Sequence, residues 1–435
     1  MSVLSISACL AFASVTGFFR PVQVDGRWRM ERPGKEPFTI LSTSHVSFRG
    51  ESGKSLQEWE KETSDRLSMW GFNTVGNPLD KAKGLEFPHF RYIQFTPLFM
   101  LDDPKDGDRW ILGPMKKGTR KRFPNVFSPK WRDFCFQAAK KRAVRHMHDR
   151  NLIGYFTDNE LRWFGHAVTN HVSGLFDACM EKPDGHSAKV ALVDFLEKKG
   201  LKCGDEIAVS VKRDFLAEIA ERYYSTVAAA IRAADPNHLV LGSRLHAMGR
   251  WDSGTDLLVV EACGRHCDVV SVNSYPWVDM EKGVVYGGDP SKGSIVAMKD
   301  RWREICRHAR RPVFVSEWSF VAKDSGLPCT KGAGQVFDTQ AERVKAAETN
   351  ARLMLSEPGI IGYNFFKWRD DLPPPPDVKR RVENKNYGLV SKDEVPYAAL
   401  TEMFTRIHRE HFNGKINKEK DSVGTDTACY GENIQ

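Results

Sequence analysis

The chain has 435 residues, of which 41% are hydrophobic and 28% are charged, close to the averages for folded soluble proteins. This composition excludes a disordered chain, and no apolar stretch reaches the roughly 18 residues that a membrane-spanning helix needs. Lys and Arg outnumber Asp and Glu by 64 to 56, a formal net charge of +8. The basic runs are short and scattered, so we expect a mixed surface charge and neither a nucleic-acid nor a membrane partner, with an anionic partner as the alternative.

The nine cysteines are spaced irregularly. Cys263 and Cys267 lie four residues apart, but a zinc site needs a second ligand pair at a similar spacing, which the sequence lacks. We therefore expect structural thiols or one local disulfide there, and no metal. The sequence also lacks a glycine-rich nucleotide-binding loop, so no cofactor is expected.

The N-terminal region divides into two pieces. Residues 1–16 hold a short apolar run with Ala11-Phe12-Ala13 inside it, and this small-x-small form is typical of a signal-peptide cleavage site. No Lys or Arg precedes the run, so we interpret residues 1–16 as a signal remnant or an opening strand. This favours a secreted or periplasmic location, with a cytoplasmic one as the alternative. Residues 17–37 carry Asp25-Gly26 between two apolar runs, which predicts a β-hairpin.

Short apolar runs then alternate with helical patterns along the chain. Continuous apolar runs of this length are typical of strands that are buried on both faces. The expected strands are residues 38–44, 72–76, 92–99, 152–157, 239–245, 269–274, 313–316 and 360–366, and the expected helices are 56–70, 131–150, 215–234, 294–309 and 340–355. Eight strands alternating with helices predict an α/β fold, a (β/α)8 TIM barrel.

The barrel and its N-terminal hairpin should occupy residues 17–412, followed by a polar tail at 413–435. Two long insertions, residues 161–211 and 320–338, follow the fourth and seventh strands. Both would lie on the face of the barrel that carries the active site.

Polar residues at the carboxyl ends of barrel strands are candidates for binding or catalysis. The substrate-binding candidates at the expected strand ends are His45, Asn77, Asp158, Asn159, Arg244, Tyr275, Trp318 and Trp368. The alternatives are a supporting contact for His45, Asn77 and Arg244, a loop anchor for Asp158, and core packing for Trp318.

Two carboxylates stand out, Glu160 after the fourth strand and Glu317 after the seventh. Two carboxylates that face each other across a barrel are the machinery of glycoside hydrolysis, and a separation of about 5–5.5 Å gives retention of configuration. A salt bridge would explain either glutamate alone, but it is a weaker explanation for the pair.

Several phrases of the sequence resemble β-agarases of glycoside hydrolase family 50, which are part of a large clan of retaining (β/α)8 enzymes. The phrases are Gly17-Phe18-Phe19-Arg20, Asp25-Gly26-Arg27-Trp28, Gly154-Tyr155-Phe156-Thr157-Asp158-Asn159-Glu160, Ser316-Glu317-Trp318 and Tyr363-Asn364-Phe365-Phe366-Lys367-Trp368. The resemblance runs from about residue 17 to about residue 404 and so covers most of the chain.

This resemblance implies that Glu160 is the general acid/base, that Glu317 is the nucleophile, and that Asn159 binds the sugar 2-hydroxyl. It also implies that Tyr275 orients Glu317 and that the sugar at the cleavage point stacks on Trp368. The implied substrate is a galactan such as agarose, or its oligosaccharides. The alternatives are an exo-β-galactosidase or another β-glycosidase of the clan, and a non-catalytic carbohydrate-binding barrel. Endo or exo action and the oligomeric state stay open.

Overall fold

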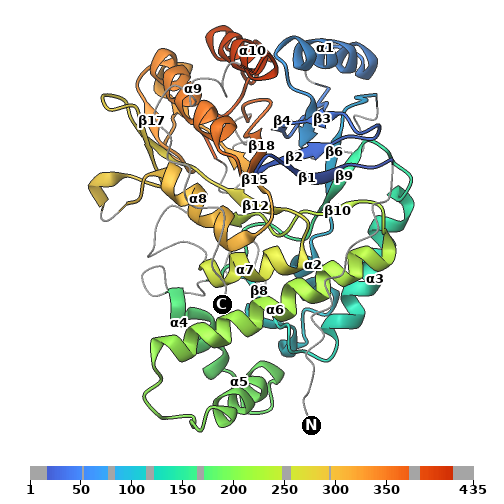
Figure 1. Ribbon diagram of the computed structural model, residues 1–435, viewed down its shortest axis with the longest axis vertical. Helices are drawn as coiled ribbons and strands as arrows, with labels where there is room; N and C mark the ends of the chain where they lie inside the picture. Colours follow the sequence, from blue (N-terminus) through green and yellow to red (C-terminus); the bar gives the residue numbers. More distant parts are fainter. Residues whose placement is uncertain are drawn as a thin grey trace.

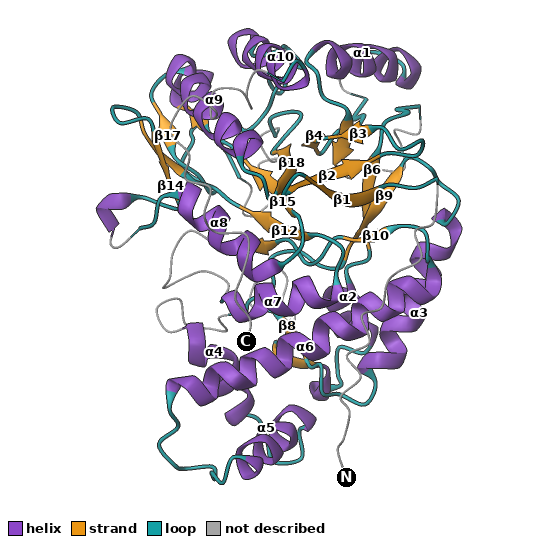
Figure 2. Ribbon diagram, viewed as in Figure 1, coloured by secondary structure: helices purple, strands orange, loops and turns teal. Residues whose placement is uncertain are grey.

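The computed structural model describes residues 17–50, 53–76, 84–113, 122–163, 171–246, 256–292, 295–371 and 383–414. The predicted segment 1–16, the candidate Asn77 and residues 415–435 of the polar tail lie outside the described residues. Figure 1 shows one central sheet surrounded by helices, and Figure 2 separates the two by colour.

The central sheet contains nine strand segments, and every neighbouring pair in it is parallel. Their order across the sheet is β10-β9-β6-β5-β4-β18-β15-β12-β11. The segments are β4 (Ile40–Ser44), β5 (Thr74–Gly76), β6 (His89–Tyr92), β9 (Leu152–Phe156), β10 (Leu239–Val240), β11 (Leu245–His246), β12 (Val270–Asn273), β15 (Val313–Trp318) and β18 (Ile360–Phe365).

The two ends of this order belong to one stretch of chain. Only residues 241–244 separate β10 from β11, and this stretch bonds to both flanking strands. The Leu241 N–H donates to Tyr155 O of β9 (2.9 Å), and the Ser271 hydroxyl of β12 donates to Leu241 O. The sheet is therefore curled, as in TIM-barrel-type proteins, and the carboxyl ends of its strands lie at one edge.

Helices surround the curled sheet because each has one apolar stripe to bury. In α6 (Val209–Ala234) the residues at a spacing of four, from Phe215 to Ile231, are all buried, as this spacing predicts. The other α-helices are α1 (Leu56–Met69), α2 (Phe95–Asp102), α3 (Trp131–Ala143), α4 (His171–Met180), α5 (Ser187–Lys198), α7 (Leu257–His266), α8 (Met298–Ala309), α9 (Gln340–Ser356) and α10 (Ala398–Phe412). Among the described residues, no helix is both long and apolar enough to cross a membrane.

A small antiparallel sheet precedes the curled one. Strand β1 (Arg20–Val24) pairs with β2 (Arg27–Glu31) on either side of Asp25-Gly26, and β3 (Pro37–Phe38) pairs with β2. Phe19, Met30 and Phe38 share one buried apolar cluster with Phe314 and Ile361 of the central strands. The small sheet therefore covers the end of the curled sheet opposite to the carboxyl ends of its strands.

The prediction of a third strand over residues 92–99 is wrong. Strand β6 ends at Tyr92, and Phe95 begins α2. Phe95 and Phe99 are buried, and a continuous apolar run is the same in a buried helix as in a buried strand. Periodicity alone could therefore not separate the two.

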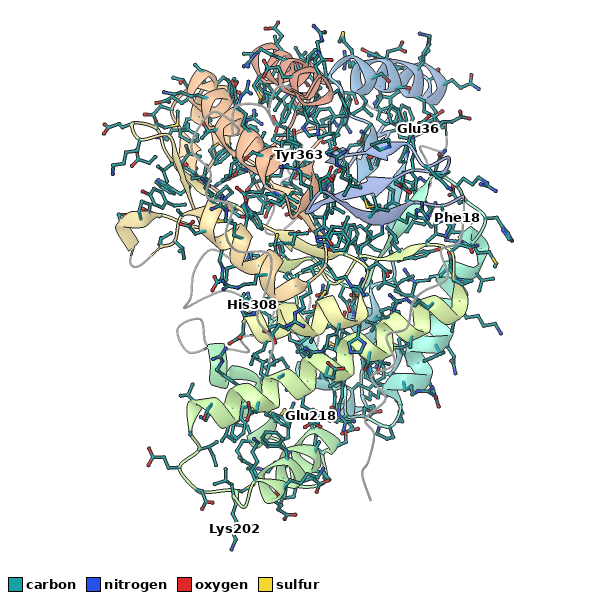
Figure 3. All side chains as sticks on the ribbon, in the orientation of Figure 1. Phe18, Glu36, Lys202, Glu218, His308 and Tyr363 are labelled. Atoms are coloured by element: carbon teal, nitrogen blue, oxygen red, sulfur yellow. The ribbon has the colours of Figure 1, made fainter. Side chains whose placement is uncertain are left out.

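The two long insertions contain structure of their own. Residues 161–211 include α4 and α5, which project from the rest of the molecule (Figure 2), and Lys202 lies at the far tip of this part in Figure 3. In residues 320–338, β16 (Val321–Ala322) pairs in parallel with β17 (Val336–Phe337). The remaining short strands are β7 (Trp110–Leu112), β8 (Phe123–Pro124), β13 (Trp277–Asp279) and β14 (Val284–Tyr286), and the 3₁₀ turns are η1 (Gly107–Arg109), η2 (Val144–His146), η3 (Pro290–Lys292) and η4 (Lys323–Ser325).

Candidate active site

The backbone at the carboxyl edge of the sheet is unusual at four positions. His45 after β4, Gln94 after β6, Glu160 after β9 and Arg244 before β11 all have left-handed conformations, with φ between 51° and 61°. For a residue other than glycine this conformation costs about 1 kcal/mol or more, and such strain is concentrated at functional sites. The strained backbone positions and the polar candidate residues therefore lie at the same carboxyl edge of the sheet.

Arg244 joins three parts of this edge. Its guanidinium donates from Nη1 to Asn159 Oδ1 (2.7 Å) and from Nη2 to Glu317 Oε2 (2.6 Å) and Ser316 O (2.9 Å). The Arg244 side chain is 6% exposed, so its ion pair with Glu317 is shielded from water. A buried ion pair with this many hydrogen bonds fixes the geometry of the carboxylate more than it stabilises the fold.

Asn273, the last residue of β12, links the two predicted catalytic carboxylates. Its side-chain Nδ2 lies 2.9 Å from Glu160 Oε1 and 3.3 Å from Glu317 Oε2. These two oxygens can therefore be no further apart than about 6.2 Å, the sum of 2.9 Å and 3.3 Å. The predicted pair does meet at the sheet edge, bridged by one amide.

Glu317 is held at both of its carboxylate oxygens. The Tyr275 hydroxyl donates to Glu317 Oε1 (2.5 Å), while Arg244 and Asn273 approach Oε2. Burial raises the pKa of Glu317 above its ordinary value; the Arg244 charge opposes this rise, the negative charge of Glu160 adds to it, and the Tyr275 hydrogen bond lowers the pKa. The two carboxylates lie in one electrostatic environment, so their protonation is linked.

Asn273 is the site residue that sequence reasoning passed over. It lies two residues before Tyr275, at the same strand end, and that position was the available signal. Its Oδ1 accepts from the Ser316 hydroxyl (2.7 Å), which leaves Nδ2 directed at the carboxylates.

The two tryptophans predicted as substrate contacts are buried instead. Trp318 is 0% and Trp368 is 1% exposed. Trp318 packs edge-on against Tyr363 and Phe365, and the ring of Trp368 lies 5.6 Å from that of Trp70. Successive side chains of a strand point to opposite faces, so Trp318 points away from the face that carries Glu317. The predicted sugar stacking on Trp368 and the predicted substrate contact of Trp318 are therefore wrong, and both rings pack in the core.

Asp158 is a loop anchor and not a substrate contact. Its carboxylate is 1% exposed and accepts from the Thr96 N–H (3.0 Å), the Thr96 hydroxyl (2.9 Å) and the Tyr223 hydroxyl (2.7 Å). It thereby ties the end of β9 to the first turn of α2 and to α6. The prediction that Asp158 contacts the substrate is therefore wrong.

His45 lies exposed at the end of β4, with its ring edge-on to Phe366 at 5.0 Å. Desolvation by the surrounding protein and the nearby charges of Lys367 and Arg244 lower the pKa of His45 to about 4. The imidazole is therefore neutral near pH 7. It can donate to or accept from a ligand, but it does not contribute a charge.

Cys263 of α7 and Cys267, directly after the helix, form no disulfide. Cys263 and Cys267 are both buried and free, so the alternative of a local disulfide is wrong and the thiols are structural. Within the described ranges, no group of three or more His, Cys, Asp or Glu side chains is placed to hold a metal ion.

No family model matches the chain. Two curated relatives come from Vibrio sp. (strain JT0107). Beta-agarase B is 24% identical over an alignment of 410 residues, and the match covers 85% of this chain and 38% of the relative. Beta-agarase A is 26% identical over an alignment of 385 residues, and the match covers 79% of this chain and 35% of the relative. The chain thus spans little more than a third of the length of these relatives.

Among solved structures, the crystal structure of BpGH50 superposes with a TM-score of 0.72 at 22% sequence identity, covering 92% of this chain and 83% of that one. The two chains share their fold. In sequence and in fold, the chain resembles the β-agarases of glycoside hydrolase family 50.

Proposed function

We propose that this protein is a retaining β-glycoside hydrolase that cleaves a galactan, such as agarose or its oligosaccharides, by double displacement. The observation that carries the proposal is the Asn273 amide between Glu160 and Glu317, which limits their nearest oxygens to about 6.2 Å, the sum of 2.9 Å and 3.3 Å. Retaining enzymes hold their carboxyl groups about 5–5.5 Å apart, whereas inverting enzymes need about 6.5–9.5 Å to admit a water molecule.

Glu317 suits the role of nucleophile because Arg244 and Tyr275 fix both of its oxygens and favour its charged form. In the first step Glu317 attacks the anomeric carbon while the carboxylic acid of Glu160 protonates the departing glycosidic oxygen. The bond to the leaving group breaks and a covalent glycosyl ester forms. In the second step Glu160 removes a proton from water, which attacks the same carbon and releases Glu317.

Asn159 and Tyr275 have supporting roles. Arg244 holds the side-chain oxygen of Asn159, so the amide Nδ2 of Asn159 is directed away from Arg244 and can donate to the sugar 2-hydroxyl. This contact strengthens in the transition state. Tyr275 keeps Glu317 oriented through the hydrogen bond to Oε1.

The substrate class comes from the two agarase relatives. We infer in addition that the curled sheet is a closed eight-stranded barrel, with β10 and β11 as two halves of one strand, and that the protein works outside the cytoplasm, where a polysaccharide is accessible. Product analysis against agarose, porphyran, carrageenan and aryl β-glycosides tests the substrate class. Turnover of none of them would contradict the proposal.

The double displacement is tested by azide rescue with an aryl β-glycoside that the wild type cleaves. Glu317→Ala should lose turnover, and added azide should restore it by taking the place of the nucleophile, which gives an α-glycosyl azide. Glu160→Ala should retain activity toward good leaving groups, and azide should then give the β-glycosyl azide. The exposed Glu197 of α5 provides the control, Glu197→Ala, with wild-type turnover. A β product from Glu317→Ala would contradict the assignment of the nucleophile.

A further inference from the structure

A loop of the second insertion lies next to Tyr275, whose hydroxyl contacts Glu317, and is held there by a separate part of the chain. The side-chain Oδ1 of Asn384 accepts hydrogen bonds from the backbone N–H groups of Thr330 (3.0 Å) and Lys331 (2.7 Å). Its own N–H donates to Lys331 O (3.1 Å). Residues 329–334 are therefore fastened to the segment that begins at residue 383.

Lys385 and Tyr387 hold the tip of this loop. Lys385 Nζ donates to Ala333 O (3.0 Å) and Gly334 O (2.9 Å), and the Tyr387 hydroxyl donates to Ala333 O (2.7 Å). Lys385 is only 7% exposed, and a nearly buried ammonium is costly unless hydrogen bonds compensate. A cation at this depth that binds two main-chain carbonyls restrains the backbone tightly.

The restrained backbone rests against the tyrosine that touches Glu317. A Cβ atom on Gly334, whose φ is +86°, would lie 3.3 Å from Cδ1 of Tyr275. A Cβ atom on Gly332 would lie 2.4 Å from the Tyr387 hydroxyl oxygen. The loop thus approaches both rings at glycines, and the Tyr275 ring has the loop backbone on one side and Phe366 at a ring distance of 6.3 Å.

We propose that Lys385 and Tyr387 are positioning residues for the nucleophile: they clamp the backbone at 333–334 against Tyr275, which holds its hydroxyl on Glu317. This inference rests on the proposed function and goes beyond it, because neither residue touches the carboxylates. Without the clamp, the Tyr275 ring gains freedom and the hydrogen bond to Glu317 Oε1 weakens.

Loss of the hydrogen bond from Tyr275 to Glu317 should change the pH profile of kcat/KM. The Tyr275 hydrogen bond lowers the pKa of Glu317, so its loss should raise that pKa. The acid limb of kcat/KM reports the ionisation of the free enzyme's nucleophile. For Tyr275→Phe we expect this limb to move up by about one pH unit, the equivalent of one hydrogen bond to a charged group. Lys385→Met should move it in the same direction by less.

The test compares four variants of the full chain with an aryl β-glycoside that the wild type cleaves: Lys385→Met, Tyr275→Phe, their combination, and Lys385→Arg. Because the clamp acts through Tyr275, Lys385→Met should move the acid limb no further once Tyr275 is Phe. Lys385→Arg should restore part of the wild-type profile, since a guanidinium can also bind two carbonyls. The control is Lys345→Met, which removes an exposed lysine on α9 whose Nζ lies 3.5 Å from Met280 O; its profile should match that of the wild type.

The possible results separate the positioning role of Lys385 from the proposed function. A Lys385→Met profile that coincides with the Lys345→Met control, or a shift that is equally large in the Tyr275→Phe background, overturns the positioning role and leaves the proposed function intact. An inactive wild type overturns the proposed function and this inference together. If Lys385→Met does not fold, Tyr387→Phe removes one donor of the clamp and takes its place in the same comparison.

Discussion

Asp158 should make the stability of this protein fall as the pH rises from about 4 to about 6. Burial raises the pKa of this carboxyl from 3.8 to about 6, and the hydrogen bonds from Tyr223 and Thr96 offset only part of that rise. Since one pKa unit corresponds to about 1.4 kcal/mol, the ionised carboxylate destabilises the folded chain by about 3 kcal/mol relative to the carboxylic acid.

The sign follows from which state holds the proton. The folded pKa lies above the unfolded one, so between about pH 4 and about pH 6 the folded chain keeps a proton that the unfolded chain has released. Stability therefore decreases as the pH rises through this window, and the full penalty is present above it. In Asp158→Asn this dependence is absent. The difference in unfolding free energy, variant minus wild type, should grow by about 3 kcal/mol from about pH 4 to about pH 7.

The assay is urea unfolding, followed by tryptophan fluorescence at a series of pH values for both proteins. The amide also changes the hydrogen bond with the Tyr223 hydroxyl, but this offset is the same at every pH and cancels in the comparison. Asp184, an exposed aspartate, gives the matched control, Asp184→Asn, whose difference from wild type should stay flat. A flat difference for Asp158→Asn as well, or one that shrinks with pH, would refute the reasoning.

Three further substitutions separate the roles of individual residues. Asn273→Ala removes the amide between the carboxylates and should lower kcat by about 10²–10³, with a loss of about 1–3 kcal/mol in stability because Asn273 is buried and hydrogen-bonded; an unchanged kcat in steady-state kinetics would contradict the bridge. Arg244→Met leaves Glu317 as a buried charge without its cation, so it should lower the free energy of unfolding in urea by about 3–5 kcal/mol and also reduce turnover. A loss of stability smaller than that of Arg213→Met, at an exposed arginine, would contradict this role of Arg244. Trp368→Ala should cost about 3–5 kcal/mol of stability while KM stays near wild type, because the ring is buried; a raised KM at full stability would restore the stacking role.

A general rule of sheets predicts which of the candidate residues lie together. Parallel strands bring their carboxyl ends to one edge, so residues far apart in the chain, such as Glu160 and Glu317, could be expected to meet. The same rule placed Asn159, Arg244 and Tyr275 beside them, and all three contact the carboxylates or each other. The direction of the strands is enough to place these residues at one edge, whatever the packing of their side chains.

The errors came where the outcome depends on side-chain direction or on packing. Trp318 follows Glu317 directly, and the alternation along a strand turns it to the helix-covered face. Asp158 stands two residues before Glu160 and is drawn inward by Thr96 and Tyr223, which a linear sequence does not place nearby. The segment that forms α2 predicts a strand because a buried helix and a buried strand can have the same continuous run of apolar residues.

The position of the amide that bridges the two carboxylates is a property of the sheet. A chain of hydrogen bonds crosses four strands below them, from the Ser42 hydroxyl to Asn364 Oδ1 (2.8 Å), from Asn364 Nδ2 to Ser316 O (3.0 Å), and from the Ser316 hydroxyl to Asn273 Oδ1 (2.7 Å). The first and last links occupy the side-chain oxygens of Asn364 and Asn273 and so fix where the Nδ2 atoms of these two residues point. The last link leaves the Asn273 Nδ2 hydrogens facing Glu160 and Glu317, because the oxygen is already taken. The register of β4, β18, β15 and β12 therefore sets the position of the donor that the two carboxylates share.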